Sequence, residues 1–181
     1  MTTTAVFAEM LVAGIEAAVW MVLLALAIAQ PHKSDLSRLA SFKDFGALVA
    51  TFVLALSYGL GIVIDRVADS IFEKIFGKAN KAQALMRLQV LGRGDKVTDF
   101  LEYIRTRIRV ARSTTLNFAL TSVAAPLFLV RCTEASRDQI LMTALVLAGL
   151  TIMGAFTAAR IGKTYDERLK QAAAMRFRKH S

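Results

Sequence analysis

The sequence predicts an all-α integral membrane protein: a four-helix bundle with a cytoplasmic helical hairpin that extends the second and third membrane helices. Two observations lead to this fold class. Of the 181 residues, 55% are hydrophobic, and they gather in four runs, approximately 5–29, 45–64, 114–130 and 140–159. Each run has about the 17–25 residues that a helix needs to cross a bilayer. In lipid such a run must be helical, because each backbone N–H and C=O needs a partner within it.

These runs divide the chain into four parts. They are two membrane helices with a short outer loop, a basic cytoplasmic hairpin, two further membrane helices and a basic cytoplasmic tail helix, at 1–64, 65–113, 114–159 and 160–181.

The first run is expected to be retained as a membrane helix. The small residues Ala27 and Ala29 resemble a signal-peptide cleavage site, so removal of this run is the alternative. However, no basic residue precedes Lys33, whereas a signal peptide begins with basic residues. Two acidic residues, Glu9 and Glu16, also interrupt the apolar run.

The distribution of positive charge predicts the orientation of the chain. The net charge is +9, and most of the 23 Lys and Arg residues lie in 65–113 or after residue 159. The positive-inside rule places both regions, and both termini, in the cytoplasm. Residues 30–44 and 131–139 then form short outer loops. We expect a multi-pass protein of the cell (inner) membrane of a bacterium.

The region after the second run continues as helix. Val67, Ile71 and Ile75 recur at helical spacing, which extends the second membrane helix until Gly77 ends it. Residues 78–91 are typical of a short amphipathic helix.

The sequence from residue 92 predicts a turn followed by a long helix. Residues 92–95 read Gly-Arg-Gly-Asp, and an unbroken apolar stripe then predicts one helix from about residue 95 to 130. The extensions of the second and third membrane helices are expected to pair antiparallel. In the basic tail, Ile161, Tyr165 and Leu169 form an apolar stripe typical of a helix on a membrane surface.

Acidic residues inside the membrane are candidate functional groups. Burial of one at a helix centre costs about 2.5–3.5 kcal/mol on insertion scales. Glu9 lies near the cytoplasmic boundary, where an interfacial position explains it, and Glu16 lies near the middle. With no basic partner at its depth, Glu16 must be protonated, face water in an assembly, or bond to polar residues of the third helix such as Asn117, Thr121 or Ser122.

A cluster of charges is expected at the cytoplasmic mouth of the bundle. Asp65, Arg66 and Asp69 reach the same depth as Glu9, and Arg66 is the nearest predicted counter-charge for Glu9. The alternative is a solvated helix turn beyond the headgroups. The expected members are Asp65, Arg66, Asp69, Arg105, Arg109 and Arg112.

The arginine-rich stretch 105–112 is expected to hold anionic lipid. A role in nucleic-acid binding is not expected, because the stretch lacks aromatic residues on which bases could stack. Small residues at Ala55 and Gly59, with Gly61 nearby, and at Gly154 and Ala158, predict close helix packing.

No catalytic, metal-binding or cofactor pattern is present, and we expect neither an enzyme nor a bound cofactor. The chain has one cysteine, Cys132, and two histidines far apart, His32 and His180. The four-span layout with a cytoplasmic hairpin is similar to that of several small bacterial membrane effectors, although no motif indicates a specific family.

Three functions remain. The first is an oligomeric pore- or channel-forming effector, in which Glu16 and the polar third helix face a shared axis and the basic region receives the trigger. The alternative is a non-conducting membrane anchor or subunit that recruits a cytoplasmic protein partner. A small transporter is disfavoured because no inverted repeat is visible. The expected partners are anionic lipid, further copies of the chain and a cytoplasmic protein.

Overall fold

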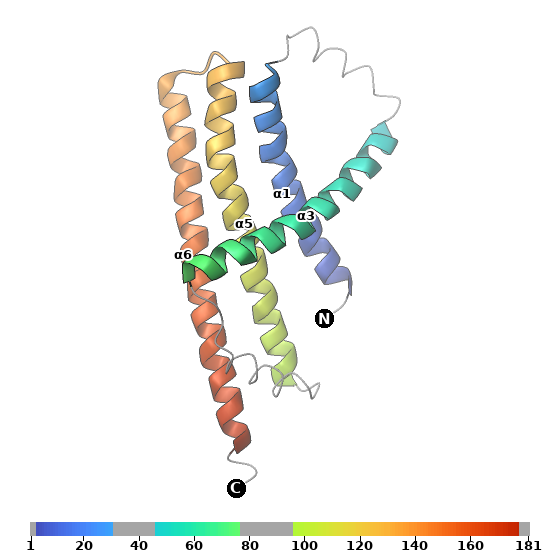
Figure 1. Cartoon of the computed structure of the whole chain (residues 1–181), viewed down its shortest axis with the longest axis vertical. Helices are drawn as coiled ribbons and strands as arrows, with labels where there is room; N and C mark the ends of the chain where they lie inside the picture. The colour runs from blue at the N-terminus through green and yellow to red at the C-terminus, as the bar shows by residue number, and fades with distance from the viewer. Residues whose placement is uncertain (1–2, 31–45, 77–95, 178–181) are drawn as a thin grey trace.

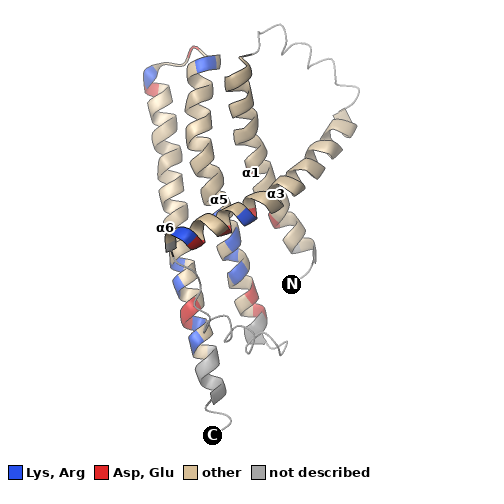
Figure 2. Cartoon of the chain, viewed as in Figure 1, with Lys and Arg blue, Asp and Glu red and all other residues tan. Residues whose placement is uncertain are grey.

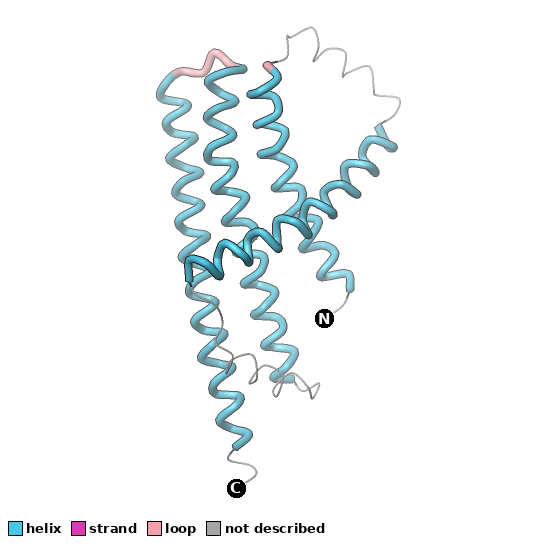
Figure 3. Tube along the Cα trace, in the orientation of Figure 1, coloured by secondary structure: helices cyan, strands magenta, loops and turns pink. Residues whose placement is uncertain are grey.

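The computed structural model describes residues 3–30, 46–76 and 96–177, which form long helices, with a short loop at 133–136 between the last two (Figures 1 and 3). The helices are α1 (Thr3–Ala29), α3 (Gly46–Phe76), α5 (Lys96–Cys132) and α6 (Arg137–Phe177). All four are long and apolar enough to cross a membrane, which confirms the all-α prediction and indicates a multi-pass membrane protein. The amphipathic helix expected at 78–91, the turn at 92–95 and nearly all of the loop at 30–44 lie outside the described residues.

The third and fourth helices are much longer than a bilayer is thick. With 37 and 41 residues, α5 and α6 are about 55 and 60 Å long, against a hydrocarbon core of about 30 Å. α5 confirms the single helix predicted from about residue 95 to 130, and α6 continues without a break past residue 160. One residue, Pro126, removes a backbone donor within α5, whereas α6 contains no proline.

Most of the described charged residues lie toward one end of the bundle, and a few, among them Arg131 and Asp138, lie at the opposite end (Figure 2). We call the first of these the charged end; α1 begins and α6 ends toward it (Figure 1). There α5 and α6 continue together, and we call residues 96–112 and 160–177 the α5–α6 extension. In it, Leu101, Ile104 and Ile108 of α5 pack against Tyr165 and Leu169 of α6 in one buried core.

This core corrects the expectation for the tail. The stripe of Ile161, Tyr165 and Leu169 packs against α5 and is not spread on a membrane surface. The physical reason is that the two apolar stripes shield each other from water. Each large apolar side chain buried in this way contributes about 1.5–3 kcal/mol to the folding free energy. Before this stripe in α6, Gly154 packs closely against Thr115 of α5. A β-carbon added at Gly154 would lie 2.5 Å from the Thr115 hydroxyl oxygen, and Ala158 is buried. The close packing expected at these two small residues of α6 is confirmed.

α3 lies obliquely across α1 and α5 (Figure 1). Where it crosses α1, Gly14 and Gly61 bring the two backbones into contact. A β-carbon on Gly14 would collide with the Ser57 carbonyl, and one on Gly61 with the Met10 carbonyl. Of the small residues of α3 named from the sequence, Gly61 is buried at this crossing, whereas Ala55 and Gly59 are exposed. The crossing therefore uses the neighbouring face of α3.

The first part of α3 is not covered by any other described part of the chain. Every residue from 46 to 56 is exposed, whereas Ser57, Gly61 and Ile64 are buried. Beyond them, the predicted stripe of Val67 and Ile71 also faces outward, because the face of α3 that meets α5 carries acidic residues. α3 is therefore attached to the bundle through its second half.

The end of α1 is capped by α5. Gln30 adopts a left-handed backbone conformation (φ 44°), and its N–H donates to the Leu26 carbonyl at 2.9 Å. The Cys132 thiol donates to the same carbonyl at 3.3 Å, and Arg131 donates to the Ala27 carbonyl at 3.5 Å. These contacts satisfy carbonyl groups that a helix end otherwise leaves unpaired.

Candidate functional site

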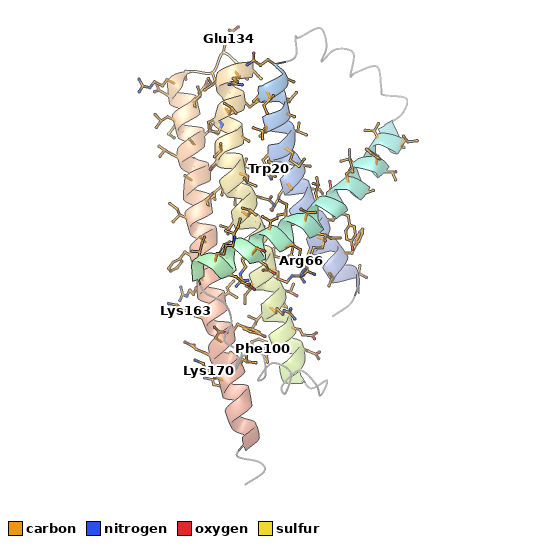
Figure 4. All side chains as sticks on the ribbon, viewed as in Figure 1. Trp20, Arg66, Phe100, Glu134, Lys163 and Lys170 are labelled. Atoms are coloured by element: carbon orange, nitrogen blue, oxygen red, sulfur yellow. The ribbon has the colours of Figure 1, made fainter. Side chains whose placement is uncertain are left out.

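A hydrogen-bonded cluster joins α1 to α5 inside the apolar part of the bundle. Asn117 is buried, and its Nδ2 donates to the Ala13 carbonyl at 2.9 Å and to Glu16 Oε2 at 3.1 Å. Thr114 Oγ1 donates to Glu16 Oε1 at 3.3 Å. Trp20, labelled in Figure 4, donates from Nε1 to Asn117 Oδ1 at 3.2 Å. We call Glu16, Trp20, Thr114 and Asn117 the Glu16 cluster.

Helix geometry explains why these four residues meet. Glu16 and Trp20 are four residues apart on α1, and Thr114 and Asn117 are three apart on α5, so each pair lies on one helix face. Each carboxylate oxygen of Glu16 accepts one hydrogen bond, and both polar atoms of the Asn117 amide are used. The cluster therefore holds α1 and α5 in one register.

Of the three polar residues expected as alternative partners for Glu16, Asn117 bonds to it, whereas the hydroxyls of Thr121 and Ser122 bond to backbone carbonyls of α5. Thr121 donates to the Asn117 carbonyl and Ser122 to the Ala119 carbonyl, each at 2.7 Å. Hydroxyls in helices commonly bond to a carbonyl one turn earlier. Thr114 and Trp20 were missed as partners, although their spacing of three and four residues from Asn117 and Glu16 was a usable signal.

A second set of contacts, which we call the α3–α5 clasp, lies closer to the charged end. Arg109 makes a two-pronged ion pair with Asp65, with Nη2 2.5 Å from Oδ2 and Nε 3.3 Å from Oδ1. Arg112 Nη1 lies 3.1 Å from Asp69 Oδ1, and its guanidinium lies 5.6 Å from the centre of the Phe72 ring. The Asp65 side chain is only 5% exposed, so the pair with Arg109 is shielded from water on the Asp65 side.

The predicted pairing of Glu9 with Arg66 is wrong. Arg66 is exposed, and among the described residues no ion pair joins it to Glu9. The cations that act on Glu9 are Arg109 and Arg107 of α5. The reason is angular: consecutive helix residues point about 100° apart, so a helix that turns Asp65 toward α5 turns Arg66 away. Arg105, the other expected member of the cluster, is also exposed.

Asn117→Leu is expected to loosen the contact between α1 and α5. It removes two donors and one acceptor, and leaves Glu16 with Thr114 alone. At about 0.6 kcal/mol for each hydrogen bond between membrane helices, the loss is about 2 kcal/mol of folding free energy. Thermal unfolding in detergent, followed by circular dichroism, measures it. Thr121→Ala is the matched control, because that hydroxyl bonds only within α5; equal losses in both variants would contradict the role of Asn117.

The chain offers few groups for metal or redox chemistry where the structure describes it. No three His, Cys, Asp or Glu side chains in the described ranges are placed to hold a metal ion. Comparison with known protein families, characterised proteins and solved structures finds no match for the chain.

Proposed function

We propose that the chain is a self-associating, non-conducting membrane anchor whose α5–α6 extension recruits an acidic protein partner in the cytoplasm. The observation that supports it is an exposed ridge on α5, formed by Phe100, Tyr103 and Arg107. Phe100 and Tyr103 are 49% and 48% exposed. Both lie in the part of α5 that extends toward the charged end, where Figure 4 labels Phe100.

The ridge has the composition of a protein-binding surface. Positions 100, 103 and 107 share one helix face, which lies about 100° around the helix from the face of Leu101, Ile104 and Ile108 that packs on α6. Arg107 Nε donates to the Tyr103 hydroxyl at 3.0 Å, and its guanidinium lies 5.0 Å from the centre of that ring. Tyrosine and arginine held in place in this way are typical centres of binding energy at interfaces. A cationic, aromatic ridge favours an acidic partner.

An oligomeric pore is the alternative proposal. The residues expected to line it, Glu16 and Asn117, bond to each other within one chain, which favours the anchor. The outward faces of α1 and α6 carry apolar residues such as Val19, Val146 and Phe156. In favour of the pore, residues 46–56 of α3 are exposed along their whole length and offer a surface to a neighbouring copy.

Arg107→Glu is expected to abolish partner recruitment. Charge reversal at a binding centre costs at least about 2 kcal/mol, so recovery of the partner after mild-detergent purification from cells should fall about tenfold or more. Quantitative mass spectrometry of the co-purified proteins measures this recovery. Lys163→Glu is the matched control, since Lys163 is an exposed cation on α6 of the same extension. Equal recovery from the two variants would contradict a binding role for the ridge.

Reconstituted protein is expected to form a multimer that conducts no ions. Mass measurement in mild detergent tests self-association, and ion flux from loaded vesicles tests conduction. A strict monomer would contradict the self-association part of the proposal. A flux that changes in Glu16→Gln would contradict the anchor and support the pore.

A further inference from the structure

We propose that Arg160 and Lys163 of α6 form a binding site for the head group of an anionic phospholipid. Both side chains are exposed, and among the described residues no ion pair engages either of them. The site is separate from the ridge on α5, so it goes beyond the proposed recruitment of a protein partner. Its depth, its neighbours and its charge each favour a lipid.

The two cations lie at the depth of the lipid head groups. At 1.5 Å per residue, the apolar run 140–159 is about 30 Å long, which matches the thickness of the hydrocarbon core. Arg160 follows this run directly, and Lys163 lies about 6 Å beyond it. Head groups occupy about 5–8 Å on each side of the core. Both side chains can therefore reach a lipid phosphate.

The same face of α6 is apolar before the two cations. This face lies opposite the one that packs on α5, and in Figure 4 Lys163 extends from α6 on the side away from α5. Along it, Ile152, Met153 and Phe156 are 69%, 68% and 66% exposed, and Arg160 comes next. One lipid molecule can place its chains on these apolar residues and its phosphate beside the cations, which a soluble phosphate cannot do.

The local charge favours an anionic ligand. From residue 139 to 165, α6 contains no acidic residue, and Asp166 and Glu167 are the first ones after the apolar run. Sequence analysis favoured lipid binding on α5, but there Arg109 and Arg112 are engaged by aspartates of α3. The pair on α6 keeps both positive charges available. Each cation near an anionic membrane surface favours binding about fivefold, equivalent to about 1 kcal/mol.

Competition between lipids tests the site on the full-length protein. The protein in mild detergent is offered equal amounts of phosphatidylglycerol and phosphatidylcholine with the same acyl chains, and native mass spectrometry measures which lipid stays bound. We expect the wild type to retain the anionic lipid preferentially. Arg160→Gln and Lys163→Gln should each lower this preference about fivefold, and the double variant should lower it about twentyfold.

Lys170→Gln is the matched control for charge. Lys170 is an exposed lysine on the same face of α6, but it lies about 16 Å beyond the apolar run and outside the head groups. This variant, and Arg160→Lys, which retains the charge, should keep the wild-type preference. Circular dichroism confirms that each variant keeps its helices.

Three results would overturn the proposal. The first is a wild type that retains both lipids equally. The second is a loss of preference in Lys170→Gln as large as that in Lys163→Gln, which would show a general effect of net charge. The third is displacement of the bound lipid by soluble glycerol phosphate, which would show that the cations bind a free phosphate without need of acyl chains.

Discussion

Gly61→Ala is expected to separate α1 from α3. The added methyl group would occupy the position of the Met10 carbonyl, and a helix backbone cannot move away as a flexible side chain can. Overpacking in a core usually costs about 1–3 kcal/mol, and we expect a loss at or above the upper end because backbone atoms must shift. Gly14→Ala should act alike, since its methyl group would meet the Ser57 carbonyl. The midpoint of thermal unfolding in detergent measures both effects.

Gly59→Ala supplies the matched control. Gly59 lies two residues away on the same helix, and no atom lies within 4 Å of the position that its β-carbon would take. Alanine in a helix is more stable than glycine by about 0.5–1 kcal/mol, so this variant should unfold at the same temperature or slightly higher. If Gly59→Ala and Gly61→Ala lowered the midpoint equally, the close crossing of α1 and α3 would be refuted.

Arg109→Leu is expected to release the second half of α3 from α5. Among the described residues, it leaves the Asp65 carboxylate, which is 5% exposed, with the Ser113 hydroxyl at 3.5 Å as its one remaining hydrogen-bond donor. Removing one partner of a buried ion pair costs about 3–5 kcal/mol, mostly through the unpaired charge that remains. Thermal unfolding measures the loss of stability. Crosslinking between cysteines introduced on α3 and α5 measures the separation of the helices.

Two variants show whether this loss comes from the ion pair. Arg105→Leu removes an exposed arginine of the same helix and should change stability by less than about 0.5 kcal/mol. The double variant Asp65→Asn with Arg109→Leu should recover part of the loss, because no unpaired charge remains. A double variant no more stable than Arg109→Leu would show that the arginine contributes through packing and not through its charge.

The long helices were predictable because hydropathy and chain length are local properties. The run from 96 to 132 contains no strong breaker before Pro126, so the sequence alone indicated one helix of nearly the correct extent. The oblique path of α3 was not predictable. It depends on the contact between Gly14 and Gly61, which are far apart in the chain, whereas the more regular pair at 55 and 59 gave the stronger sequence signal.

The polar contacts were predictable in kind but not in every partner. Charge sign and depth predicted that Asp65 and Asp69 lie near the arginines of α5. They did not predict which of Arg105, Arg109 and Arg112 forms each ion pair. That choice depends on the rotation of each helix about its own axis, which also decides that Arg66 turns away from Glu9. The pairing of the tail with α5 was missed because an apolar stripe looks the same whether it meets lipid or another helix.

The two long helices differ in stiffness. Between Arg137 and Phe177, α6 keeps its backbone ladder free of proline, whereas Pro126 interrupts the ladder of α5. A helix bends most readily where a backbone hydrogen bond is missing, so under a sideways load we expect α5 to bend near Pro126 while α6 stays straight.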